Sequence, residues 1–158
     1  MENPFVTNGY VSDAYFCDRE METKSLIDFL VNGNNVALIS PRRYGKSDLI
    51  HHCFAQPVLK EHYYIFFIDV YATRTLSDFV NQMAKGILSS LKSWGRRALD
   101  AFLSTASSLQ ANISYDMNGN PSLSVGLGSL KQPTATLDEI FRYLGTADKP
   151  CIVAIDEF

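Results

Sequence analysis

Three short runs of branched and aromatic apolar residues most constrain how this 158-residue chain can fold. They are NVALIS at 35–40, YYIFFIDV at 63–70 and CIVAIDEF at 151–158. Each run is the length of a strand and mostly apolar, which is typical of a strand covered on both faces of a parallel sheet. Helical patterns separate the runs along the chain. The sequence therefore predicts an α/β fold, with a mostly parallel sheet flanked by helices.

Apolar residues recur at helical spacing between these runs. The predicted helices cover 18–30, about 47–57, 76–91, 98–106 and 136–144. Asp18 is expected to cap the first helix, and Thr136 with Glu139 to form a capping box at the last. From Ile113 to Leu127 the apolar period changes to two around an Asn-Gly turn, which predicts an inserted β-hairpin.

Composition excludes several classes of protein. The chain is 46% apolar and 20% charged, as soluble globular proteins are. Its net charge of −3 gives no overall basic field for nucleic-acid binding. Three widely spaced cysteines argue against a disulfide framework or zinc site and favour a reducing compartment. Without a signal-peptide pattern, or the roughly 20 apolar residues that span a bilayer, we expect a cytoplasmic protein with no membrane partner.

The segment ISPRRYGKSDLI, at 39–50, carries most of the phosphate-binding pattern G-x-x-x-x-G-K-[ST]. A loop from a strand into a helix aims backbone N–H groups at one point, where the helix N-terminus adds partial positive charge. Gly45 would allow close approach of the backbone, Lys46 would contact the β and γ oxygens, and Ser47 would ligate Mg²⁺. The predicted nucleotide-binding residues are Ser40, Pro41, Arg42, Arg43, Tyr44, Gly45, Lys46, Ser47 and Asp48.

Two features of this segment leave alternatives open. Ser40 stands in place of the first glycine of the pattern, a change that serine tolerates at modest cost. Pro41 presets one dihedral of the loop, which could offset some lost adaptability. The competing interpretation of the whole segment is a lysine-bearing turn that merely precedes a helix.

The acidic pair in IVAIDEF favours the nucleotide interpretation. A magnesium–nucleotide site needs a carboxylate at the carboxyl edge of the sheet. Asp156 ends a buried-strand run and suits that role, and Glu157 is where a water-activating base would sit. Alone, the pair could be a solvated strand terminus. Together with the loop it predicts a site for a nucleotide and Mg²⁺.

With these residues, the chain resembles the archaeal-type ATPase family, in the AAA-related and STAND branch of P-loop ATPases. Three blocks carry the resemblance across essentially the whole chain. They are a Phe-x-x-Arg-Glu core at Phe16, Arg19 and Glu20, the Pro-Arg-Arg form of the loop, and CIVAIDEF as the Walker B strand. The resemblance implies a P-loop NTPase fold of the ASCE, AAA-like type, with ATP as the nucleotide.

The resemblance also implies roles for single residues. Phosphate and Mg²⁺ would be held by Gly45, Lys46 and Ser47, with Asp156 supporting the ion and Glu157 activating water. Residues near Phe16 and Arg19 would lie by the adenine. Arg42 and Arg43 could face the phosphates, a neighbouring subunit or acidic residues of their own chain.

Family members continue beyond the Walker B strand, with one later strand inserted between the Walker A and Walker B strands. A sensor residue and a C-terminal, often winged-helix-like, region follow. The resemblance therefore implies that residues 1–158 are the N-terminal part of a P-loop ATPase domain, with an incomplete sheet. A natural protein ending at Phe158 would contradict this.

The leading hypothesis is an ATP-binding and ATP-hydrolysing domain that acts as a molecular switch or motor. An arginine from another subunit of a homo-oligomer, or from a later segment, would speed turnover, so we expect weak or no turnover by this chain alone. The alternative is a non-catalytic nucleotide-binding or protein-interaction module. Nucleic acid would be a partner only through the absent C-terminal region.

Overall fold

The computed structural model describes residues 16, 18–91, 96–107, 109, 111–115, 121–125 and 130–158. The helices are α1 Glu20–Val31, α2 Lys46–Ala55, α3 Pro57–Lys60, α4 Leu76–Leu91, α5 Arg96–Thr105 and α6 Pro133–Gly145. The strands are β1 Tyr64–Asp69, β2 Ala111–Tyr115, β3 Pro121–Val125 and β4 Cys151–Asp156. The chain divides into two compact units, Met1–Tyr63 and Tyr64–Phe158.

In the first unit, α1 packs against α2, and α2 against α3. Each helix contributes a buried leucine: Leu26, Leu49 and Leu59. Cys53 of α2 is also fully buried, and its thiol donates to the carbonyl oxygen of Thr23 in α1 over 3.9 Å. Burial raises the pKa of Cys53 to about 11. The thiol is therefore protonated at neutral pH and serves as a packing group between the helices.

The predicted strand at 35–40 is wrong. Residues 34–41 form no strand, and the apolar side chains of this run are largely exposed. Ile39 is 94% exposed and Val36 is 39% exposed. An apolar run becomes a strand only when another strand offers it hydrogen bonds. The sheet pairs found among the described residues are β1 with β4 and β2 with β3, so this run has no such partner.

Two predicted helix starts also need correction. The N-cap of α1 is Arg19, because Asp18 lies in the left-handed region with φ of 71° and makes no cap. At the other end of the chain, α6 begins at Pro133 instead of at Thr136. Proline is favoured in the first turn, where its missing N–H costs nothing. Thr136 is therefore inside the helix, fully buried, and donates to the carbonyl of Gln132 over 3.1 Å.

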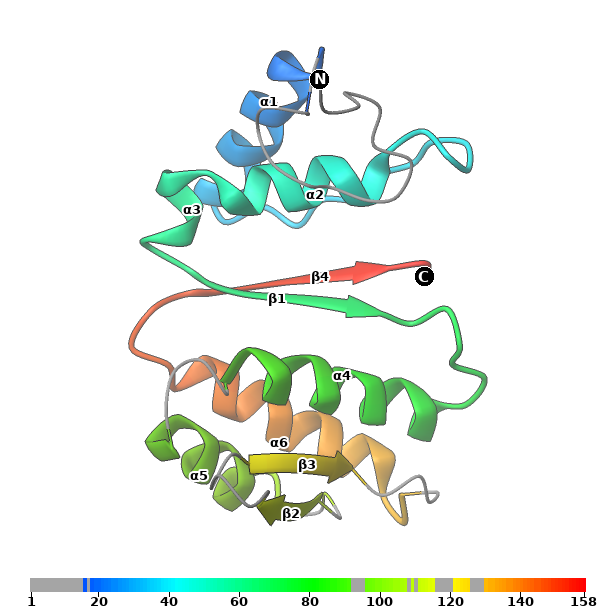
Figure 1. The fold of residues 1–158 in the computed structure, drawn as a ribbon, viewed down its shortest axis with the longest axis vertical. Helices are drawn as coiled ribbons and strands as arrows, with labels where there is room; N and C mark the ends of the chain where they lie inside the picture. The colour runs from blue at the N-terminus through cyan, green and yellow to red at the C-terminus, as the bar shows by residue number, and fades with distance from the viewer. Residues whose placement is uncertain are drawn as a thin grey trace, which may run out of the picture. The chain divides into compact units, whose positions relative to one another are not determined.

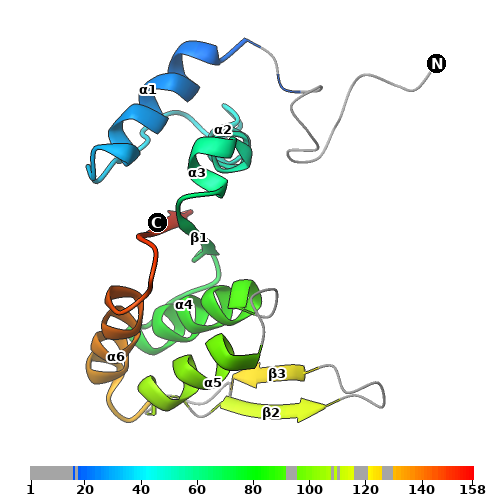
Figure 2. The same ribbon diagram turned by 90° about the vertical axis from the view of Figure 1, so that its left-hand side faces the viewer.

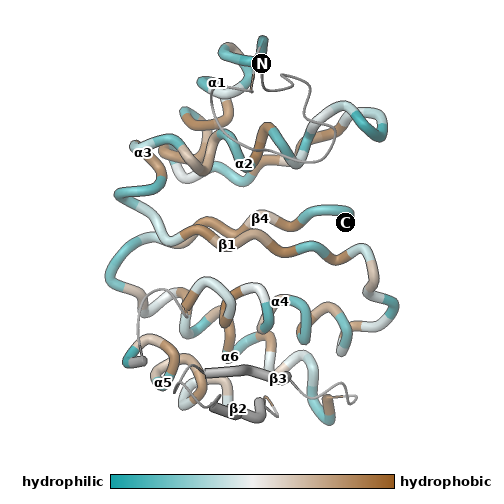
Figure 3. Tube along the Cα trace, viewed as in Figure 1, coloured by the Kyte–Doolittle hydropathy of each residue, from teal (hydrophilic) through white to brown (hydrophobic). Residues whose placement is uncertain are grey.

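The second unit is built on a parallel pair of strands, β1 and β4 (Figure 1). Their register joins Tyr64 to Cys151 at one end and Asp69 to Asp156 at the other. Both strands are apolar along most of their length (Figure 3). Their parallel pairing confirms the expected α/β class. The prediction that both strands are buried is wrong for β4, whose residues are half-buried or exposed, with Ile155 39% exposed.

Helices cover one face of this pair. α4 packs against β1, α6 against α4, and α5 against α6. The core includes Phe66 and Ile68 of β1, Val80, Met83, Ile87 and Leu91 of α4, Phe102 of α5 and Ile140 of α6. The predicted hairpin is confirmed as β2 and β3, which pair antiparallel. It lies on the side of these helices away from the parallel strands (Figure 2). Its expected turn lies outside the described residues.

At Gly86, α4 lies close to β1. A Cβ at this position would lie 2.9 Å from Ile68 Cγ1 and 3.4 Å from the carbonyl oxygen of Phe67. Ile68 is buried and cannot move aside freely. The absence of a side chain at Gly86 therefore sets the spacing of the helix on the sheet.

We expect Gly86→Ala to lower the free energy of unfolding by about 1 kcal/mol. Overpacking costs about 1–3 kcal/mol, which exceeds the gain of about 1 kcal/mol in helix propensity. Gly145 of α6 is the matched control, because a Cβ there would meet nothing within 4 Å. Urea denaturation measures the free energy of unfolding of both variants. A Gly86→Ala protein as stable as the wild type would contradict the close packing.

A reciprocal cap begins α4. The Thr75 hydroxyl accepts from Asp78 N–H over 3.1 Å, and Asp78 Oδ2 accepts from Thr75 N–H over 3.0 Å and Arg74 N–H over 3.1 Å. The hydrogen bond from the Thr75 side chain, then that from the Arg74 backbone, lowers the pKa of Asp78. A lowered carboxyl pKa means stability that is present above the unfolded value of 3.8 and is lost as pH falls through the folded value.

Asp78→Ala should therefore lower the melting temperature at neutral pH. The difference in melting temperature between this variant and the wild type should shrink as pH falls below 3.8. Circular dichroism melts across this pH range provide the measurement. Asp100→Ala, which removes an exposed carboxylate from α5, is the matched control. If the difference in melting temperature between Asp78→Ala and the wild type stays constant with pH, the charge of Asp78 does not act through the cap.

Candidate functional site

The loop before α2 keeps the helix-start half of the predicted phosphate site. Gly45 is the N-cap of α2 and is left-handed, with φ of 66° and ψ of 33°. Lys46 follows directly as the first helical residue, and the N-cap residue, a glycine, has no side chain to cap the helix. A left-handed residue beside a right-handed one curls successive N–H groups toward one side, which is the geometry of anion-binding nests. Arg43, with φ of 64°, adds a second left-handed bend.

The Lys46 side chain bonds to the first residues of this loop. Its Nζ donates to the carbonyl oxygen of Ser40 over 3.0 Å and to that of Pro41 over 3.2 Å. The ammonium group thus joins the end of the loop to its beginning. Ser40, in place of the pattern's first glycine, supplies one of these carbonyls, so the substitution does not prevent closure.

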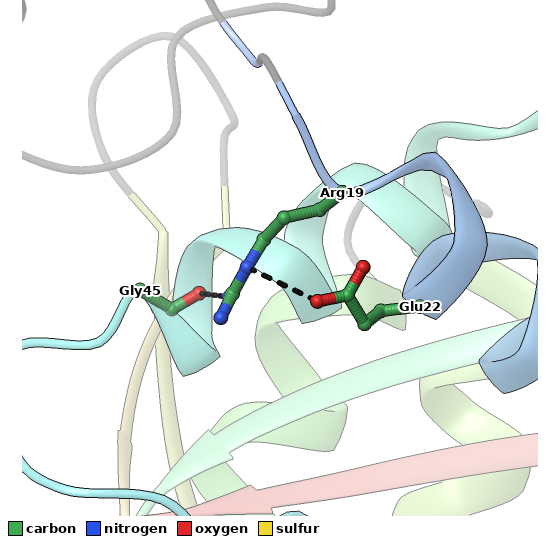
Figure 4. A network of polar contacts seen from close by, with 3 residues as sticks. All are labelled: Arg19, Glu22 and Gly45. Atoms are coloured by element: carbon green, nitrogen blue, oxygen red, sulfur yellow. Dashed lines mark hydrogen bonds and ion pairs between the residues drawn. The ribbon is translucent and has the colours of Figure 1, made fainter.

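Arg19 reaches the same loop from α1 (Figure 4). Its Nη1 donates to the carbonyl oxygen of Gly45 over 3.2 Å, and its Nε lies 3.9 Å from Glu22 Oε1. The Arg19 side chain is 27% exposed. The resemblance implied a place near the adenine for this residue, and the structure puts its guanidinium against the loop backbone.

Phe16 contacts a different part of α2. Its ring stacks on that of His52, with centroids 4.0 Å apart and an angle of 15° between the planes. His52 had no functional assignment from the sequence, because adjacent histidines on a helix do not indicate a metal site. The stacked pair places an aromatic surface at His52, between one and two turns along α2 from Lys46.

Side chains in the middle of the loop are exposed to solvent. Arg42, Arg43 and Tyr44 are exposed, and Tyr44 is 63% exposed. Neither arginine forms an ion pair with a carboxylate in the part of the chain that the structure describes. Asp48 lies in the first turn of α2, where a carboxylate stabilises the positive end of the helix.

The acidic pair predicted from IVAIDEF belongs to the second unit. Asp156 is the last residue of β4, and its Oδ1 accepts from the N–H of Glu157 over 3.0 Å. Glu157 is exposed and left-handed, with φ of 57°. Asp156 thus ends a parallel strand at its carboxyl edge, as the sequence predicted.

Sequence reasoning missed Asp69. The parallel register places it beside Asp156, and alternation along the strands puts both side chains on the face opposite Phe66 and Ile68. Asp69 Oδ1 accepts from the N–H of Tyr71 over 2.8 Å. The signal was present, because YYIFFIDV and CIVAIDEF both place an aspartate at the end of an apolar run.

The structure thus gathers the predicted site residues into two groups. Ser40 through Asp48 lie in the first unit with Arg19 and Phe16, whereas Asp156 and Glu157 lie in the second. Among the described residues, no three or more His, Cys, Asp or Glu side chains are placed to hold a metal ion together. In that same part of the chain, no helix is both long and apolar enough to cross a membrane.

Comparison with known proteins adds no assignment. No protein-family model matches the chain, and neither curated proteins nor solved structures gave a match. The support for a function therefore comes from the residues and contacts of the chain itself.

Two glycines allow the loop conformation to be tested. Gly45 and Gly33 are both left-handed, with φ of 66° and 74°, and an added Cβ would meet no atom closer than 3.7 Å at either site. We expect Gly45→Ala and Gly33→Ala each to lower the free energy of unfolding by about 1–2 kcal/mol, the cost of a left-handed alanine. Chemical denaturation measures both, and a neutral Gly45→Ala would contradict the left-handed turn.

Proposed function

We propose that residues 40–48 bind the phosphates of ATP and that the chain is part of a P-loop ATPase domain. One observation carries the proposal: the left-handed Gly45 turns the chain into α2 with Lys46 as the first helical residue. In the proposed site, the backbone N–H groups of this turn and the ammonium group of Lys46 would converge on the phosphates. This is the donor set that phosphate groups require.

The residues present suit a phosphate chain. The N-cap residue Gly45 has no side chain that could cap α2, which suits its first-turn N–H groups to an anionic acceptor. The partners of Lys46 Nζ are neutral carbonyls of the same loop, at Ser40 and Pro41. The bonds from the Lys46 ammonium group to these carbonyls are already charge-assisted, and phosphate oxygens would add the attraction of a full negative charge that a carbonyl lacks. Lys46 would therefore exchange these carbonyls for phosphate oxygens.

For Mg²⁺, the proposed ligands are the hydroxyl of Ser47 and the carboxylate of Asp156, the latter through the water shell of the ion. Hydroxyl and carboxylate oxygens are the ligands that this hard cation prefers. When bound, Mg²⁺ supplies charge neutralisation at the phosphate oxygens. These two residues belong to different units, so the proposal for the metal rests on their chemistry and on the position of Asp156 at the carboxyl edge of β4.

For hydrolysis, Lys46 would hold negative charge that develops on the phosphates, and Glu157 would orient the attacking water and take up its proton. The N–H groups at Gly45, Lys46 and Ser47 would fix the phosphate chain in position. An arginine from another subunit or a later segment would complete the charge stabilisation. The proposed outcome is a nucleotide-dependent switch or motor in the cytoplasm.

Lys46→Ala tests nucleotide binding. We expect the affinity for Mg-ATP, measured by isothermal titration calorimetry, to fall about 10- to 100-fold, because one charge-assisted hydrogen bond is lost. Lys60→Ala, which removes an exposed lysine of α3 from the same unit, should bind as the wild type does. Equal affinities of Lys46→Ala and wild type would refute the proposed nucleotide site.

Glu157→Gln separates an enzyme from a binding module. The amide cannot accept a proton, so we expect Mg-ATP binding to persist while phosphate release, followed by a coupled colorimetric assay, falls to background. Asp138→Asn, at an exposed site of α6, is the control for loss of a carboxylate. Both assays use the full-length protein that the proposal implies, because residues 1–158 alone are expected to turn over ATP weakly or not at all. In that protein, binding without turnover in the wild type, unchanged by Glu157→Gln, would support the non-catalytic alternative.

A further inference from the structure

The carbonyl oxygen of Gly45 accepts two hydrogen bonds. One comes from Leu49 N–H over 3.0 Å and is the first bond of α2. The other comes from Arg19 Nη1 over 3.2 Å and originates in α1, 26 positions earlier in the chain (Figure 4). The first bond is present at the start of any helix, whereas the second is specific to this chain.

A fixed carbonyl at Gly45 also fixes the N–H of Lys46. The two groups belong to the same planar trans peptide and point in opposite directions. Gly45 is the residue at which this peptide could rotate most easily, because it has no Cβ to restrict its dihedrals. Because both groups lie in one plane and point in opposite directions, the hydrogen bond that holds the Gly45 carbonyl toward Arg19 points the Lys46 N–H away from Arg19.

The backbone of Arg19 is held by a hydrogen bond, and its guanidinium group has an ion-pair partner. Arg19 is the N-cap residue of α1, and its own carbonyl accepts from Thr23 N–H over 2.9 Å. Its Nε lies 3.9 Å from Glu22 Oε1, on the first turn of the same helix. The planar fork of arginine thus contacts Glu22 through one nitrogen and Gly45 through another. A lysine has a single ammonium group and cannot reproduce this spacing.

We propose that Arg19 is a positioning residue for the phosphate loop, and that it sets the direction of the Lys46 N–H through the Gly45 carbonyl. This inference rests on the proposed function, because it concerns the same loop. It assigns Arg19 to recognition of the phosphate chain, whereas the family resemblance implied a place by the adenine. Glu22 supports it by orienting the guanidinium group.

A role at the phosphate chain and a role at the adenine predict different ligand selectivity. Affinities for one ligand with a base and one without it can distinguish them. We expect Arg19→Met to weaken Mg-ATP and inorganic tripolyphosphate by about the same factor, roughly tenfold for one hydrogen bond. The ratio of the two affinities should therefore not change. A loss confined to Mg-ATP, with tripolyphosphate affinity unchanged, would show that Arg19 recognises the base and would overturn the proposal.

Two further variants separate position from charge. Arg19→Lys keeps the positive charge but loses the two-point hold, so it should bind both ligands nearly as weakly as Arg19→Met. Full recovery in Arg19→Lys would mean that charge alone suffices, which would contradict the proposal. Lys24→Met removes an exposed cation from the same helix and should bind as the wild type does.

A ligand-free measurement keeps this inference distinct from the nucleotide proposal. In ¹⁵N–¹H spectra of the whole chain without ligand, Arg19→Met should shift the backbone amide signal of Lys46, and Lys24→Met should not. Circular dichroism confirms that each variant is folded. If the wild type binds neither ligand, the proposed function fails, and the Lys46 amide still decides whether Arg19 positions the loop. An unmoved Lys46 signal in folded Arg19→Met overturns the positioning role.

Discussion

The peptide that joins Gly45 to Lys46 is the constraint on which the first unit depends. Its left-handed glycine turns the chain into α2, and its carbonyl starts the hydrogen bonds of that helix. The same carbonyl receives Arg19, which ties the loop to α1. A single peptide therefore connects two helices and orients the loop between them. Any residue other than glycine at this position would meet the steric cost of the left-handed region.

Lys46 shows how such a loop can be stable before it meets a ligand. A buried or partly buried ammonium group needs acceptors, and the carbonyls of Ser40 and Pro41 provide them. Phosphate binding at this loop would thus be an exchange of acceptors, and the net gain would be smaller than the gross strength of the new bonds. The affinity would then depend on how well the backbone N–H groups are already directed, which is the part proposed for Arg19.

The sequence predicted features that depend on one segment better than features that depend on a partner elsewhere in the chain. The strands β1 and β4 were predictable because two apolar runs pair with each other. The run at 35–40 carried an equal signal but has no partner among the described residues, and hydrogen-bond partners cannot be read from the run itself. The start of α6 was misplaced because Pro133 precedes the Thr136 signal. The contact from Arg19 to Gly45 was not predictable, since no periodicity links positions so far apart.

The most direct test of the proposed site is a crystal structure of the chain grown with Mg-ATP, in which the partners of Lys46 Nζ are read from the density. The predicted result is a phosphate chain against the N–H groups of Gly45, Lys46 and Ser47, with Nζ moved from the carbonyls of Ser40 and Pro41 onto phosphate oxygens. A nucleotide bound elsewhere, with Nζ still on those two carbonyls, would contradict it.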